Sequence, residues 1–209
     1  MNSVLSINYK LVVILVLILS SCKQEKENLV PKGHRSVKLS FVDANINLPN
    51  EYVEISIDEL IEVWEYAEVD SVFKENKIQW LIQLRDSPAF ATMFCDSSNV
   101  DNYIYFQKGK HVFLTKEIAD QYLTNVQRNL RGSSELGGFN FTKVESKINS
   151  GDEAQLIKFK YKFDPEGEER TEYRTQYLFS SKTKTFGMVV SRSDEVDFER
   201  LIRDVKILD

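Results

Sequence analysis

Apolar and polar residues alternate along several short segments of this chain, which is the pattern of β-strands with one buried face. The clearest segment spans residues 157–163, where apolar side chains at odd positions alternate with lysines at even positions. The same alternation, or a short apolar run, predicts strands at residues 37–41, 44–48, 78–84, 90–95, 103–106, 171–180 and 185–191. Because the last two segments follow residues 157–163 closely, we expect these three to form an antiparallel meander.

Three other segments have apolar residues at helical spacing. The first begins after Ser56, which stands three residues before Glu59 in the spacing of a capping box. The second spans residues 116–131, and Gly132 is expected to end it as a C-cap. The third is expected to start at Ser193, with acidic residues in its first turn. The apolar faces comprise Ile57, Leu60, Ile61 and Trp64, then Ile118, Tyr122, Val126 and Leu130, then Phe198, Leu201, Ile202 and Val205.

The combination of these elements indicates an α+β fold, in which an antiparallel β-sheet is flanked by helices. With 209 residues, of which 42% are hydrophobic and 11% aromatic, the chain is long enough for one domain with a substantial core. The net charge of -5 gives no electrostatic attraction to polyanions, so we expect no nucleic-acid partner.

The first 21 residues have the three-part pattern of a secretory signal peptide. Lys10 precedes an apolar run at residues 11–19, which is shorter than the ~20 residues that a transmembrane helix needs. The end of the run, Leu19-Ser20-Ser21-Cys22, resembles the lipobox of bacterial lipoproteins, in which the cysteine is acylated, for instance with palmitate, and becomes the first mature residue. This resemblance implies a membrane anchor at Cys22, and the alternative is a secreted protein in which Cys22 is coincidental.

A charged run at residues 23–28 follows Cys22 and has no apolar face to bury. We therefore divide the chain into a lipoprotein signal peptide (residues 1–21), a flexible tether (residues 22–36) and a single α+β domain (residues 37–209). The charged run is similar to the one after the cysteine in surface lipoproteins of Bacteroidetes-type bacteria. We expect a cell-envelope protein anchored to the outer membrane. The sequence leaves two alternatives for its side of that membrane, the periplasmic face and the cell surface.

The sequence holds few groups for nucleophilic or metal chemistry. Cys95 has no disulfide partner if Cys22 carries lipid, and one thiol with the distant His34 and His111 does not make a zinc site. A Cys-His enzyme would need Cys95 beside His111, whereas a thiol at the end of an apolar run usually packs as a small hydrophobe. We found no phosphate-binding glycine loop, and we expect no catalytic residue, no metal and no cofactor.

Lys158, Lys160 and Lys162 form a stripe on one face of the clearest strand. On an exposed face this stripe is a possible interaction surface for anionic lipids or for an acidic protein. The alternative is that the lysines only protect an exposed strand from pairing with other molecules.

The order of elements resembles the PsbP-like and DcrB-like superfamily. The similarity is carried by a strand running into Leu48-Pro49, a long central helix, Gln176-Tyr177-Leu178-Phe179, residues 186–190, and Asp197-Phe198-Glu199-Arg200-Leu201-Ile202 leading to Ile207. It implies an antiparallel sheet between helices, as a PsbP-like α/β/α sandwich, and transfers no catalytic residue. We expect a non-catalytic binding or accessory lipoprotein with an unidentified protein partner, and the alternatives are an envelope enzyme or a lipoprotein of immunity or secretion.

Overall fold

The structure is a computed structural model, and it describes residues 30–137, 139–150, 154–165, 171–181 and 183–208. The chain divides into a compact unit, Pro31–Asp209, and the segment Met1–Val30 before it. The fold described below is that of the unit Pro31–Asp209. Within the described part of the chain, no helix has both the length and the apolar character needed to cross a bilayer.

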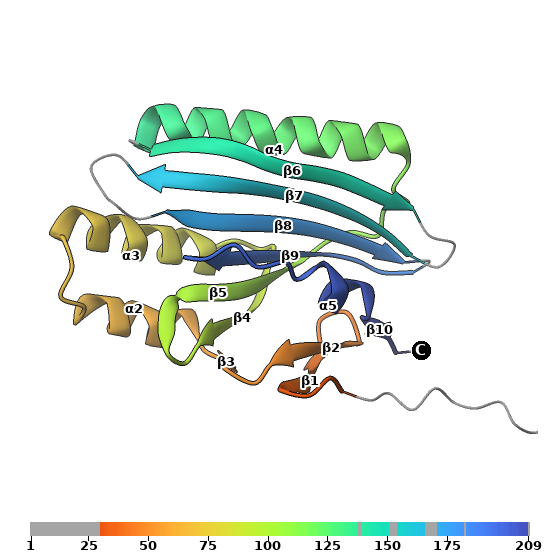
Figure 1. The fold of residues 1–209 in the computed structure, drawn as a ribbon, viewed down its shortest axis with the longest axis horizontal. Helices are drawn as coiled ribbons and strands as arrows, with labels where there is room; N and C mark the ends of the chain where they lie inside the picture. Colours follow the sequence, from red (N-terminus) through yellow and green to blue (C-terminus); the bar gives the residue numbers. More distant parts are fainter. Residues whose placement is uncertain (1–29, 138, 151–153, 166–170, 182, 209) are drawn as a thin grey trace, which may run out of the picture. The chain divides into compact units, whose positions relative to one another are not determined.

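Two antiparallel sheets form the framework of the unit (Figure 1). The larger has the order β3-β4-β5-β9-β8-β7-β6 and the smaller the order β1-β2-β10. The three strands β7, β8 and β9 are consecutive neighbours, which confirms the predicted meander. The bounds are β1 His34–Leu39, β2 Ala44–Pro49, β3 Tyr52–Glu54, β4 Phe90–Asp96, β5 Asn99–Lys108, β6 Phe139–Ser150, β7 Ala154–Pro165, β8 Glu172–Ser181, β9 Thr185–Arg192 and β10 Lys206–Ile207.

Helices α2, α3 and α4 cover one face of the large sheet, and the small sheet and the short helix α5 pack against the other. The helices are α2 Ile57–Glu65, α3 Ser71–Arg85, α4 Lys116–Gly137 and α5 Glu199–Arg203. Figure 1 shows α4 running along β6 at one edge of the sheet, while α2 and α3 lie toward β3, β4 and β5. The expected α+β architecture, an antiparallel sheet with helices packed on it, is therefore confirmed.

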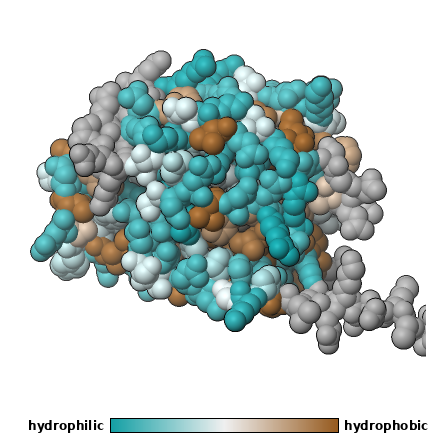
Figure 2. Space-filling view, in the orientation of Figure 1, coloured by the Kyte–Doolittle hydropathy of each residue, from teal (hydrophilic) through white to brown (hydrophobic). Residues whose placement is uncertain are grey.

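Each face of the large sheet has its own hydrophobic core. The core between the two sheets is rich in phenylalanine, and the ring of Phe186 packs against Phe41, Phe106 and Phe179 with centroid distances of 6.2, 6.3 and 5.1 Å. The core beneath α2 and α3 contains Trp64, which is 2% exposed as its place on the apolar helix face predicts. The surface seen in Figure 2 is largely hydrophilic, with apolar residues scattered among polar ones.

Residues 78–84 are part of helix α3, so the strand predicted there is wrong. Asp70 caps this helix, because its side chain accepts hydrogen bonds from the backbone N–H groups of Val72 and Phe73. The buried side chains Leu81 and Leu84 are three residues apart, as on one face of a helix. A short apolar run fits a buried helix as well as a strand, and the cap and the surrounding residues decide between them.

Three further boundaries differ from the prediction. Strand β1 starts at His34, so residues 34–36 are strand and not tether. Helix α4 continues through Gly132 to Gly137, and β6 extends the sheet beyond the predicted meander. A register shift between Lys143 and Glu145 in β6 interrupts the alternation that identifies a strand in a sequence.

The last helix, α5, is short and begins only at Glu199. Its N-cap, Phe198, makes no side-chain capping hydrogen bond, so the predicted cap at Ser193 is wrong. The acidic residues before α5 instead form ion pairs with basic residues of the large sheet, Asp194 with Arg192 and Glu195 with Lys160. These ion pairs tie the non-helical segment before α5 to β9 and β7.

Candidate functional site

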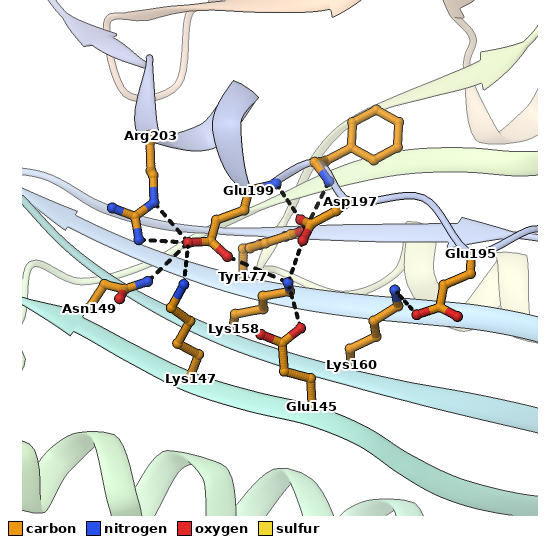
Figure 3. A network of polar contacts seen from close by, with 11 residues as sticks. Glu145, Lys147, Asn149, Lys158, Lys160, Tyr177, Glu195, Asp197, Glu199 and Arg203 are labelled. Atoms are coloured by element: carbon orange, nitrogen blue, oxygen red, sulfur yellow. Dashed lines mark hydrogen bonds and ion pairs between the residues drawn. The ribbon is translucent and has the colours of Figure 1, made fainter.

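Lys158 and Lys160 of β7 are buried beneath the segment that precedes α5 (Figure 3). Their side chains are 1% and 6% exposed. The ammonium of Lys158 lies 2.6 Å from Asp197, 2.7 Å from Glu145 and 3.5 Å from Glu199. Burial opposes its charge, but the hydrogen bonds to the first two carboxylates outweigh that effect and raise the pKa of Lys158.

The carboxylate of Glu199 joins three elements at this site. It pairs with Lys147 of β6 at 3.2 Å and with Arg203 of α5, and it accepts a hydrogen bond from Asn149 at 3.1 Å. Burial alone would raise the pKa of Glu199, yet these cations and hydrogen bonds hold it below its ordinary value. In Figure 3, four carboxylates (Glu145, Glu195, Asp197 and Glu199) face four cations (Lys147, Lys158, Lys160 and Arg203). The cluster balances its own charge.

The buried hydroxyl of Tyr177 ties the same segment to β8. It donates to Asp197 at 3.1 Å and accepts a hydrogen bond from the backbone N–H of Phe198, also at 3.1 Å. We expect Tyr177→Phe to lower the free energy of unfolding by about 1–2 kcal/mol, because the buried N–H loses its acceptor. Chemical denaturation measures this change. Tyr173→Phe, at a half-buried position of the same strand, is the control, and an equal loss there would contradict the assignment.

The expectation that Lys158, Lys160 and Lys162 form an exposed stripe is therefore wrong for the first two lysines. Their charges are satisfied inside the protein because the acidic segment 194–199 lies over them. Only Lys162 has a substantially accessible side chain, 37% exposed, and it pairs with Asp164 at 3.1 Å. The alternation in the sequence placed the three lysines on the correct face but could not show that a distant segment covers it.

A second polar network lies on the helix-covered face of the large sheet. Glu172 and Arg174 of β8 form an ion pair, and Glu172 also accepts a hydrogen bond from Ser191 of β9. The guanidinium of Arg174 donates to the hydroxyl of Tyr103 at 3.1 Å. Burial opposes the charge of Glu172, but the nearby Arg174 and Lys77 outweigh it and hold the pKa of Glu172 below 4.5.

Lys77 of α3 completes this second network from above the sheet. Its ammonium lies 5.3, 5.6 and 4.9 Å from the ring centroids of Trp64, Trp80 and Tyr103, within cation–π range. It also lies 3.7 Å from the carboxylate of Asp101. Burial lowers the pKa of Lys77 in spite of these partners. The side chain is thus a component of the core, held by rings on one side and by carboxylates on the other.

Sequence reasoning missed this second network, although a signal for it exists. Lys77 stands four residues before Leu81 on the apolar face of α3, where a charged residue needs a partner. Glu172 and Arg174 occupy the polar face of the strand, opposite to Tyr177 and Phe179. A strand in a sheet covered on both sides has no solvent face, and that layering is visible only in the structure.

The structure does not bring Cys95 and His111 together. Cys95 of β4 pairs with Tyr103 of β5, whereas His111 follows the far end of β5 at Lys108. Tyr103 and Lys108 are five residue steps apart along β5, which is about 17 Å at the usual rise per residue. Cys95 is 2% exposed, and burial raises the pKa of its thiol to about 12. An activated Cys-His pair is therefore not formed.

The remaining candidate ligand sites are two hollows that open to the surface. Two hollows, of 440 and 490 Å³, lie between α4 and β6 and between α2 and β4, and each opens to the surface. Among the described residues, no group of three or more His, Cys, Asp and Glu side chains is arranged to hold a metal ion. The predicted lipidation site, Cys22, lies outside the described residues.

Comparison with known proteins identifies the type of fold. No protein-family model matches the chain, and no curated protein sequence matches it. The solution structure of cyanobacterial PsbP (CyanoP) from Synechocystis superimposes with a TM-score of 0.53 at 10% identity, over 87% of this chain and 96% of that one. The Ran-binding protein Mog1p of Saccharomyces cerevisiae aligns with a TM-score of 0.47 at 9% identity, over 84% and 96% of the two chains, and adds no argument at that score. At 10% identity the first match establishes architecture alone, and the domain of this chain has a PsbP-like fold.

Proposed function

We propose that this protein is a lipid-anchored, non-catalytic binding or accessory protein of the bacterial cell envelope. The observation that carries the proposal is the lipobox-like Leu19-Ser20-Ser21-Cys22 at the end of an apolar leader. A single acyl chain gives only marginal membrane binding, whereas the two or three chains of a lipoprotein cysteine give a stable anchor. The outer membrane is the proposed location, and the protein partner is to be identified by experiment.

The geometry of the described domain supports a non-catalytic role. The charged clusters at Lys158 and at Arg174 are each neutralised by partners within the domain. The thiol of Cys95 is buried and its pKa is raised, so it is a poor nucleophile at neutral pH. The surface of the domain is therefore better suited to binding than to chemistry.

Cys22→Ala should move the protein from the membrane fraction to the soluble fraction of the cell, because it removes the acylation site. Metabolic labelling with a fatty acid should also be lost. Cys95→Ala is the matched control, since it removes the other cysteine of the chain and should change neither readout. If Cys22→Ala leaves location and labelling unchanged, the lipoprotein assignment is wrong and a secreted protein is the better description.

Crosslinking in intact cells tests the accessory role. The native protein should capture the same envelope protein reproducibly, and Cys22→Ala should lose that capture because its local concentration at the membrane falls. Protease accessibility of intact cells in the same samples distinguishes the surface face from the periplasmic face. Turnover of envelope substrates by the purified chain would overturn the non-catalytic role.

A further inference from the structure

An exposed loop with basic and apolar residues connects β5 to α4. Residues 108–116, hereafter the 108–116 loop, have the sequence KGKHVFLTK and contain no acidic residue. Phe113 is 68% exposed and Val112 is 37% exposed, while Leu114 between them and α4 is only 4% exposed. Phe113 and Val112 are thus two adjacent exposed apolar residues in a loop that carries three lysines.

Hydrogen bonds to three strands hold the loop in place, and this conformation exposes Phe113. The backbone of Val112 donates to Thr185 at 3.1 Å and accepts from Ser180 at 2.6 Å. The N–H of Leu114 donates to Gln155 at 2.7 Å. These bonds tie the loop to β7, β8 and β9 and hold Leu114 inside, which leaves Phe113 outside.

Gly109 lets the loop come this close to the sheet. A Cβ at this position would lie 3.2 Å from the carbonyl oxygen of Thr185, which is tighter than most such contacts. A side chain at the start of the loop would therefore push the backbone of Thr185 away by a few tenths of an ångström. This close approach indicates that the start of the loop packs directly on β9.

The loop and the turn next to it are rich in basic residues. Lys108, Lys110 and Lys116 belong to the loop itself and are all exposed. Lys184 lies in the adjoining turn between β8 and β9 and approaches Asp43 at 4.0 Å, and Glu117 follows directly in α4. The loop thus has a positive charge although the chain as a whole has a net charge of -5.

We propose that the 108–116 loop is a membrane-docking surface, which places Phe113 and Val112 among lipid headgroups and binds their phosphates through its lysines. Lysines near an anionic surface and an aromatic ring at headgroup depth are a favourable pair for interfacial binding. The proposal uses the proposed lipid anchor only to bring a membrane close to the domain. The ability of the loop to bind lipid does not depend on that anchor.

The test uses the chain from residue 22 onward with Cys22→Ala, so that binding is independent of the anchor. The described core clusters contain no residue before Val37, so this chain keeps the whole described core. In Phe113→Trp, the emission of the introduced tryptophan should shift to the blue when phosphatidylglycerol vesicles are added. Tyr66→Trp, at an 85% exposed position between α2 and α3, should show no shift.

Co-sedimentation with the same vesicles gives the second readout. Phe113→Ser, and separately Lys108→Glu with Lys110→Glu, should each weaken binding at least tenfold. Tyr66→Ser and Arg128→Glu are the controls, and the latter is exposed on α4 about 18 Å along the helix from Lys116. Equal binding to phosphatidylcholine vesicles, or unchanged binding of the loop variants, would overturn the proposal. Since no variant carries lipid, either result leaves the assignment of Cys22 untouched.

Discussion

Arg174→Met should lower the free energy of unfolding by about 3 kcal/mol, because it leaves the carboxylate of Glu172 without its main partner. The side chains of Arg174 and Glu172 are only 19% and 23% exposed, so water replaces the lost partner poorly. The change also removes the guanidinium that donates to Tyr103. Chemical denaturation followed by circular dichroism measures the loss.

A second substitution distinguishes this cause from a general loss of packing. Adding Glu172→Gln to Arg174→Met removes the unpaired charge, and the double variant should recover part of the stability. Arg200→Met is the control, because Arg200 is 88% exposed and its ion pair with Asp204 should contribute little. A double variant that is less stable than Arg174→Met would show that the uncompensated charge is not the cause.

Lys158→Met should lower the free energy of unfolding by about 1–3 kcal/mol and loosen the segment before α5. The cost is smaller than for Arg174, since Asp197 and Glu145 are 51% and 40% exposed and can recover hydration. Hydrogen exchange should rise in residues 194–205 and stay unchanged in α4. Lys162→Met is the matched control from the same strand, where a 37% exposed lysine should have a small effect.

The two networks also make stability fall in acid. The pKa of Asp197 is held below 3.8 and that of Glu172 below 4.5, so each carboxylate stabilises the fold above those values. Burial opposes their ionisation, and the neighbouring cations, Lys158 for Asp197 and Arg174 for Glu172, outweigh it. The stabilisation is lost as the pH falls below about 4.5, because protonation then removes the ion pairs. Lys158→Met should flatten this acid dependence, whereas an unchanged slope would contradict the role of Lys158.

Several elements of the fold follow from local sequence. The capping box at Ser56 and Glu59 predicted the start of α2, and both of its hydrogen bonds form. The alternation at residues 157–163, 171–180 and 185–191 predicted the meander of β7, β8 and β9. These signals are local because a cap or an amphipathic period is written in residues that are close along the chain.

The sequence by itself determined the signal-peptide pattern, the main strands and two of the helices, and the α+β class, since each depends on neighbouring residues. Only the tertiary structure decided which charged residues are buried. Two of the carboxylates that neutralise Lys158, those of Asp197 and Glu199, come from 39 and 41 positions away. Lys77 lies against Tyr103, which belongs to another element. The exposure of Phe113 beside the buried Leu114 likewise depends on bonds to β7, β8 and β9. A periodic pattern identifies the two faces of an element, but what packs against each face depends on segments that are distant in the sequence.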